Sequence, residues 1–266
     1  MKLSRELKAE TMKQKGKRNI LVPLAFLALL FFWTLFLLKG IKQEELPSGY
    51  FSLLYQYPVM NSILVPLMVS VVASRICDME VKGDTMKILF TLEKRGHFFD
   101  CKLLMGMKYL VLFFAGQTAL ILLSGKLFGF TQEIPWKHLV LFFISGFSVA
   151  AALLLLQEIL SLFSRSQIFP LVVGLAGSFL GLFSMFFPAK IMRLVLWSYF
   201  AVFSTTGLNW DKTTRISTYY EIPFPVSTFL LFLVFCIAAF LLCRTLIQKR
   251  RSEPCCFDVS GQKIKN

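Results

Sequence analysis

The sequence predicts an all-α polytopic membrane protein with six transmembrane helices. Of its 266 residues, 56% are hydrophobic, and the mean hydropathy is +0.66. Several apolar runs approach or exceed the roughly 20 residues that a helix needs to cross a bilayer. The formal net charge is +14, but the basic residues are spread over the segments between these runs. That distribution is typical of membrane topology, so we expect a lipid bilayer and no nucleic acid as partner.

Residues 1–19 are predicted to be a cytoplasmic elbow segment. They carry seven Lys or Arg residues and two Glu residues. Leu3, Leu7 and Met12 give one weak apolar stripe, so an interfacial helix and a solvated positive anchor both stay open. The next run, Ile20–Leu38, is 19 residues long, and no small-residue cleavage site follows it. We therefore expect a retained first span rather than a signal peptide.

Five further spans are predicted along the chain. The second contains Pro66, which predicts a kink whose freed carbonyl group is met by a neighbouring helix. The fifth contains Gly174, Gly177 and Gly181, a small-residue spacing that allows close packing within one subunit or at a seam between two copies. The six spans cover residues 20–38, 58–72 or as far as 76, 109–127, 139–160, 168–187 and 224–243.

The outer region over residues 188–224 decides the topology. Ile191–Leu208 is 18 residues long and could form a seventh span, but six spans place 21 Lys and Arg residues inside and eight outside. The positive-inside rule therefore favours six spans with both termini cytoplasmic. Ile191–Leu208 is then expected to be a re-entrant or interfacial outer helix, with Trp197 and Tyr199 at headgroup depth. Residues 20–246 are expected to form a single transmembrane domain, and residues 247–266 a cytoplasmic tail.

No sequence motif supplies an enzyme active site. A GxxxxGK[ST] phosphate loop, HExxH and GxSxG are all absent, so we expect this chain neither to hydrolyse ATP nor to act as an intramembrane hydrolase. The two histidines, His97 and His138, are predicted on opposite sides of the membrane and cannot share a metal ion. None of the six cysteines falls in an outer loop, which excludes an extracellular disulfide framework. We expect no cofactor or metal on this chain.

Gln157 and Glu158 form a candidate polar site inside the fourth span. Ionisable groups inside spans are usually functional or paired. Glu158 could take part in proton coupling, or it could pair with Arg165 or a loop lysine near the headgroups. An isolated glutamate without a second acidic relay site favours the pair.

The charged segment over residues 75–108 is the candidate coupling site. It contains seven Lys or Arg residues and five Asp or Glu residues. Between these charges lies an apolar ridge at roughly helical spacing, formed by Met86, Leu89, Phe90 and Leu92. Asp84 or Thr85 can cap a short helix that inserts this ridge into a partner's groove. A ridge that lies on the membrane surface or packs on its own bundle is the alternative.

Residues in this segment resemble the cytoplasmic signature of ABC transporter type-2 permeases. That signature has an acidic residue, Gly-Thr, two leucines, a proline and an Arg, with a Lys at the next span. The corresponding residues here are Glu80, Gly83, Thr85, Leu89, Leu92, Arg95 and Lys102. The sequence departs from the pattern at three places: Glu93 replaces the proline, Asp84 separates the Gly from the Thr, and Arg95 lies about one residue early.

In size and N-terminal pattern, the chain is most similar to permeases of lantibiotic-immunity and bacitracin-resistance transporters. The resemblance implies that an ABC ATPase on a separate chain binds ATP and magnesium. It also implies a second permease chain, identical or paralogous, in the bacterial plasma membrane, and an amphipathic antimicrobial peptide as exported substrate. The ATPase-coupling residues would be Glu80, Gly83, Asp84, Thr85, Met86, Leu89, Phe90, Leu92 and Arg95. An ion-coupled secondary transporter and a non-transporting scaffold or sensor subunit are the alternatives.

Overall fold

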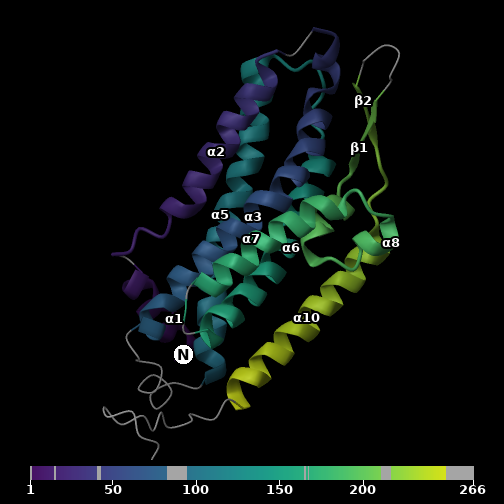
Figure 1. Ribbon diagram of the computed structural model, residues 1–266. Helices are drawn as coiled ribbons and strands as arrows, with labels where there is room; N and C mark the ends of the chain where they lie inside the picture. Colours follow the sequence, from purple (N-terminus) through teal and green to yellow (C-terminus); the bar gives the residue numbers. More distant parts are fainter. Residues whose placement is uncertain are drawn as a thin grey trace, which may run out of the picture.

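The computed structural model describes residues 2–14, 16–40, 43–82, 95–164, 166, 168–210 and 217–249. Long helices run beside one another, and a two-stranded hairpin lies at the end of the molecule opposite the N-terminus (Figure 1). In order, the elements are α1 Lys2–Gln14, α2 Leu21–Leu38, the 3-10 helix η1 Gln43–Ser48, α3 Gly49–Lys82, α5 Arg95–Phe128, α6 Trp136–Phe163, α7 Ile168–Ser184, α8 Ala189–Met192, the 3-10 helix η2 Leu196–Ser198, α9 Tyr199–Val202, β1 Thr206–Trp210, β2 Ser217–Glu221 and α10 Val226–Lys249.

Five of the described helices, α2, α3, α5, α6 and α10, are long and apolar enough to cross a membrane by length and composition. They correspond to the first four predicted spans and the last. Helix α7 corresponds to the fifth predicted span, but it has only 17 residues. At ~1.5 Å per residue it extends about 25 Å, near the lower limit for a span. A mainly helical, polytopic membrane protein is therefore confirmed, whereas the fifth predicted span, and with it the total of six, stays a prediction.

Helix α3 lies at the centre of the bundle and packs against α2, α5, α6 and α7 (Figure 1). The buried amides of Asn61 and Gln117 exchange two hydrogen bonds of 3.1 and 2.6 Å between α3 and α5. Pro66 has no N–H group, so the carbonyl oxygen at position 62 lacks its usual donor within the helix. Ser178 Oγ on α7 donates to the next carbonyl oxygen, that of Ile63, at 2.8 Å. Because lipid offers no hydrogen bonds, such contacts between helices satisfy buried polar groups.

The charged segment over residues 75–108, predicted as a coupling loop between the second and third spans, is helical at both ends. Helix α3 continues to Lys82, and α5 already begins at Arg95. The added turns are helical because they bury large apolar side chains in the main core, including those of Ile76 and Phe99. Local charge suggested a loop, but tertiary packing decides the structure of these turns.

The second span is predicted to begin at residue 58, but its helix α3 already begins at Gly49. Tyr50 is buried and packs edge-on against Phe130, with ring centroids 5.1 Å apart. Tyr57 is also buried, and its hydroxyl lies 3.0 Å from Thr34 Oγ1 on α2. These two aromatic side chains therefore pack inside the helix bundle.

The single outer helix predicted over Ile191–Leu208 is wrong, because the chain there forms α8, η2, α9 and most of β1 in succession. Ser198 Oγ donates hydrogen bonds to the carbonyl oxygens of Met192 and Val195, which hold the chain in a turn. Strand β1 pairs with β2 in antiparallel register, with Thr206 opposite Glu221. The all-α prediction missed this hairpin.

The glycine face of α7, Gly174, Gly177 and Gly181, is covered by other parts of the same chain. A Cβ atom at Gly174 would overlap Ser70 Oγ of α3, and one at Gly177 would overlap the Trp197 indole. A Cβ atom at Gly181 would lie 3.0 Å from Trp197 Cβ. In the described residues, these glycines therefore allow close approach within one subunit.

Replacing Gly177 with Ala is expected to destabilise the protein by about 1–3 kcal/mol, because the rigid Trp197 ring must move. The apparent melting temperature of the purified protein in detergent measures this loss. Gly40→Ala is the matched control, since nothing lies within 4 Å of a Cβ atom there. Equal melting temperatures for the two variants would contradict the packing described for α7.

Candidate coupling site

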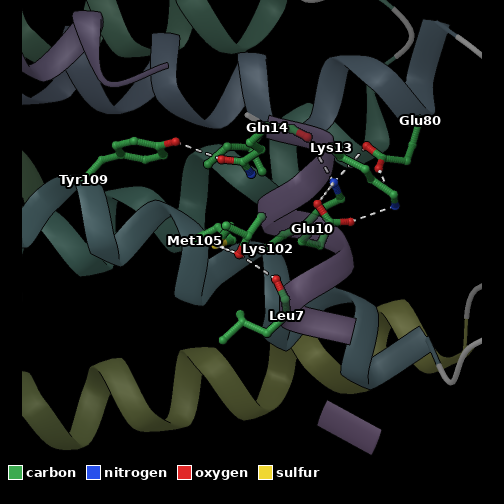
Figure 2. Close-up of polar contacts among 10 residues, drawn as sticks. Leu7, Glu10, Lys13, Gln14, Glu80, Lys102, Met105 and Tyr109 are labelled. Carbon is green, nitrogen blue, oxygen red and sulfur yellow. Dashed lines mark hydrogen bonds and ion pairs between the residues drawn. The ribbon is translucent and has the colours of Figure 1, made fainter. Parts of the chain in front are cut away.

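Four charged side chains meet where α1, α3 and α5 come together, and we call them the charge network: Glu10, Lys13, Glu80 and Lys102. Lys102 Nζ donates to Glu80 Oε2 at 2.8 Å and lies 3.9 Å from Glu10 Oε2. Lys13 Nζ donates to Glu10 Oε1 at 3.0 Å and lies 3.6 Å from Glu80 Oε1. Figure 2 shows the four side chains converging between the three helices. The two lysines and two glutamates balance in charge.

Lys102 is the most buried member of the charge network, with 0% of its surface exposed. Its ammonium group also donates to the carbonyl oxygen of Ile76 at 2.9 Å and lies 4.9 Å from the centre of the Phe98 ring. A buried ammonium ion is tolerated only when opposite charges and acceptors surround it. The Lys102–Glu80 pair therefore fixes the last turns of α3 to the first turns of α5.

Helix α1 lies along the start of α5 and completes the charge network. Two turns after Lys102 on α5, Tyr109 Oη donates to Gln14 Oε1 at 2.9 Å (Figure 2). At the other end of α1, His97 Nδ1 lies 3.4 Å from Glu6 Oε2. The polar face of α1 is thus turned toward the bundle, whereas Met12 is exposed.

Helix α10 holds the beginning of α5 from another side. Arg244 forms an ion pair of 2.9 Å with Asp100. A Cβ atom at Gly96 would lie 2.6 Å from Gln248 Nε2, so glycine permits the close approach of α10 here. The first turns of α5 are therefore in contact with α1, α3 and α10.

The structure describes two of the predicted coupling residues, and one of them belongs to the charge network. Glu80 is the acidic partner of Lys102, and Arg95 is the first residue of α5. The other predicted coupling residues lie outside the described residues: Gly83, Asp84, Thr85, Met86, Leu89, Phe90 and Leu92. The two helices that flank residues 83–94, α3 and α5, are thus joined through Glu80 and Lys102.

Sequence reasoning missed the contribution of α1 to this site. Glu10 and Lys13 are three residues apart and can pair on one helix face, which is a detectable signal. Nothing in the sequence, however, indicates that this pair meets Glu80 and Lys102 from distant segments.

Gln157 connects α6 to α7 and α3. With the amide nitrogen turned toward α7, it donates to the carbonyl oxygen of Pro170 at 3.0 Å. Its oxygen then accepts from Ser70 Oγ at 3.1 Å and from the Gly174 backbone N–H at 3.3 Å. These contacts give Gln157 a packing role between three helices.

Glu158 lies inside the bundle rather than near its surface, with 0% of its area exposed. Its carboxylate faces Gly106 of α5, where a Cβ atom would lie 3.1 Å from Glu158 Oε1. Among the described residues, neither carboxylate oxygen has a hydrogen-bond partner. The expected partner Arg165 lies outside the described residues. Glu158 is thus a buried acidic group next to the charge network but outside it.

The long apolar helices and the buried polar contacts between them define a multi-pass helical membrane protein. A family model described as ABC-2 family transporter protein matches residues 7–181, which is more than half of the chain. The chain therefore belongs to the ABC-2 family of transporter proteins. The match spans all four members of the charge network. The search of curated proteins found no match for this chain.

Proposed function

We propose that this chain is the permease subunit of an ATP-driven exporter. Membership of the ABC-2 family supports a transporter membrane subunit that works with an ABC ATPase. The observation that carries the coupling role is the buried Lys102–Glu80 pair, which joins the helices on either side of residues 83–94. A force applied to that segment would act on α3 and α5 together, because the pair resists their separation.

In this proposal, the ATPase binds the segment that contains Leu89 and Phe90, and ATP and magnesium stay on the ATPase chain. Two permease chains, identical or paralogous, join two ATPase chains in the bacterial plasma membrane. Both termini of the permease lie in the cytoplasm, so that α1 and the charge network face the ATPase side. The substrate we propose is an amphipathic antimicrobial peptide, by similarity to immunity and resistance permeases.

One observation favours a second candidate function. Glu158 is fully buried and has no hydrogen-bond partner among the described residues, as a proton-coupling carboxylate of a secondary transporter could be. That function predicts flux driven by an ion gradient without an ATPase. A non-transporting scaffold or sensor subunit instead predicts stable partner binding with no flux.

Purification of the tagged chain from its native membranes tests the proposal. We expect an ABC ATPase to co-purify, and vanadate-sensitive ATP hydrolysis in the eluate. A purified chain with native spans but no ATPase would contradict the proposal. Ion-gradient-driven flux from such a sample would favour the secondary transporter.

A further inference from the structure

Glu158 is an additional carboxylate beside a charge network that is already balanced. The network contains two lysines and two glutamates, and Lys102 is its innermost cation. Lys102 is also the cation that attracts the Glu158 carboxylate electrostatically, whereas Glu10 repels it. Among the described residues, Glu158 is therefore a buried acceptor without a hydrogen-bond donor, close to a lysine whose ammonium group is bonded to other acceptors.

The geometry places Glu158 one helical turn from Lys102 along α5. Its carboxylate lies against Gly106, which is four residues after Lys102 and hence on the same face of α5. A glycine at this position lets the carboxylate approach the helix surface. One helical turn is ~5.4 Å, and a lysine side chain is long and flexible. The ammonium group of Lys102 could therefore reach either Glu80 or Glu158 if the helices shifted slightly.

We propose that Glu158 is a second partner for Lys102, used in another conformation of the transporter. Lys102 pairs with Glu80 of α3 in the conformation described here and with Glu158 of α6 in the other. Two carboxylates on different helices give two discrete arrangements rather than a continuous range. Before the exchange, the ion pair attaches α5 to α3, the helix that leads into residues 83–94. After the exchange, it would attach α5 to α6, inside the bundle.

Within the charge network, Glu80 would still have a cationic partner after this exchange. Lys13 Nζ lies 3.0 Å from Glu10 Oε1 and 3.6 Å from Glu80 Oε1, so one ammonium group can hold both carboxylates when Lys102 leaves. Removing a buried cation from its only partner would be strongly unfavourable, but Lys102 has an acidic partner in both arrangements. Glu158 has no hydrogen-bond partner among the described residues in the arrangement seen here, and it gains one in the other. Glu158 is a positioning residue in this account, because it acts through Lys102.

The inference rests on the proposed function, so its test uses the complex with the co-purified ATPase. Apparent melting temperatures are measured without nucleotide and after trapping with ATP and vanadate. We expect Glu158→Gln and Glu80→Gln to destabilise different states, each lowering one melting temperature by roughly 5 °C and leaving the other nearly unchanged. Glu158→Asp keeps the negative charge, so this variant should retain much of the wild-type difference in melting temperature between the two states.

Ser161→Ala is the matched control, since Ser161 is buried on the same face of α6 and its hydroxyl has no hydrogen-bond partner among the described residues. Neither state should respond to it. The inference is overturned if Glu158→Gln lowers both melting temperatures equally, if it lowers neither, or if it affects the same state as Glu80→Gln. Failure of the wild-type chain to retain an ATPase is a different result, seen before any variant is made, and it counts against the proposed function.

Discussion

Replacing Lys102 with Met is expected to lower the free energy of unfolding by about 3–5 kcal/mol. The substitution leaves Glu80 and Glu10, both largely buried, to share the single ammonium group of Lys13. It also removes the donor to the Ile76 carbonyl oxygen. The apparent melting temperature of the purified protein, with the yield of folded protein from membranes, measures the effect.

Lys108→Met is the control for this prediction. Lys108 lies on the same helix but is exposed, so its replacement should change stability by no more than about 0.5 kcal/mol. A further variant that replaces both Lys102 and Glu80 with Met should recover part of the lost stability, because it removes the acidic partner together with the lysine. Equal stability of the Lys102 and Lys108 variants would show that the charge network contributes nothing.

The double substitution Leu89→Asp with Phe90→Asp is expected to abolish co-purification of the ATPase, with a loss of at least about tenfold. Two carboxylates in place of the apolar ridge cannot be buried in a partner's groove without a large desolvation cost. The permease itself should still be recovered from membranes. The amount of ATPase per permease chain in the eluate is the measurement.

Glu93→Gln serves as the control in the same segment, because it alters a charge outside the ridge. It should leave the amount of bound ATPase unchanged. If the double variant retained the wild-type amount of ATPase, the ridge would not be the docking surface, and the ATPase would have to bind elsewhere on the cytoplasmic side.

The spans were predictable from the sequence because hydrophobic runs carry their own signal. Five predicted spans correspond to long apolar helices. Such helices can be predicted from local sequence, without knowing which distant residues they contact. The ends of α3 and α5 were not predictable, since their polar turns become helical only through packing against other helices. Trp197 is a further example: its place against Gly177 depends on a fold in the outer region that no local pattern indicates.

The candidate site was predictable in part. The resemblance to type-2 permeases marked Glu80 and Lys102, 22 residues apart in the sequence, and the structure joins them at 2.8 Å. The participation of Glu10 and Lys13 depends on how α1 lies along α5, which is a property of the fold. The burial of Glu158 was likewise hidden, because its position near the end of a span suggested contact with headgroups.

Reconstitution of the chain with its co-purified ATPase into liposomes tests the central claim most directly. The measurement is ATP-dependent movement of fluorescent amphipathic cationic peptides across the membrane, with a hydrolysis-deficient ATPase as control. The account predicts vectorial transport of at least one such peptide, lost in the control and in the Leu89→Asp/Phe90→Asp variant. Transport that persists without ATP hydrolysis, or an intact complex that hydrolyses ATP without moving any peptide, would contradict the proposed peptide exporter.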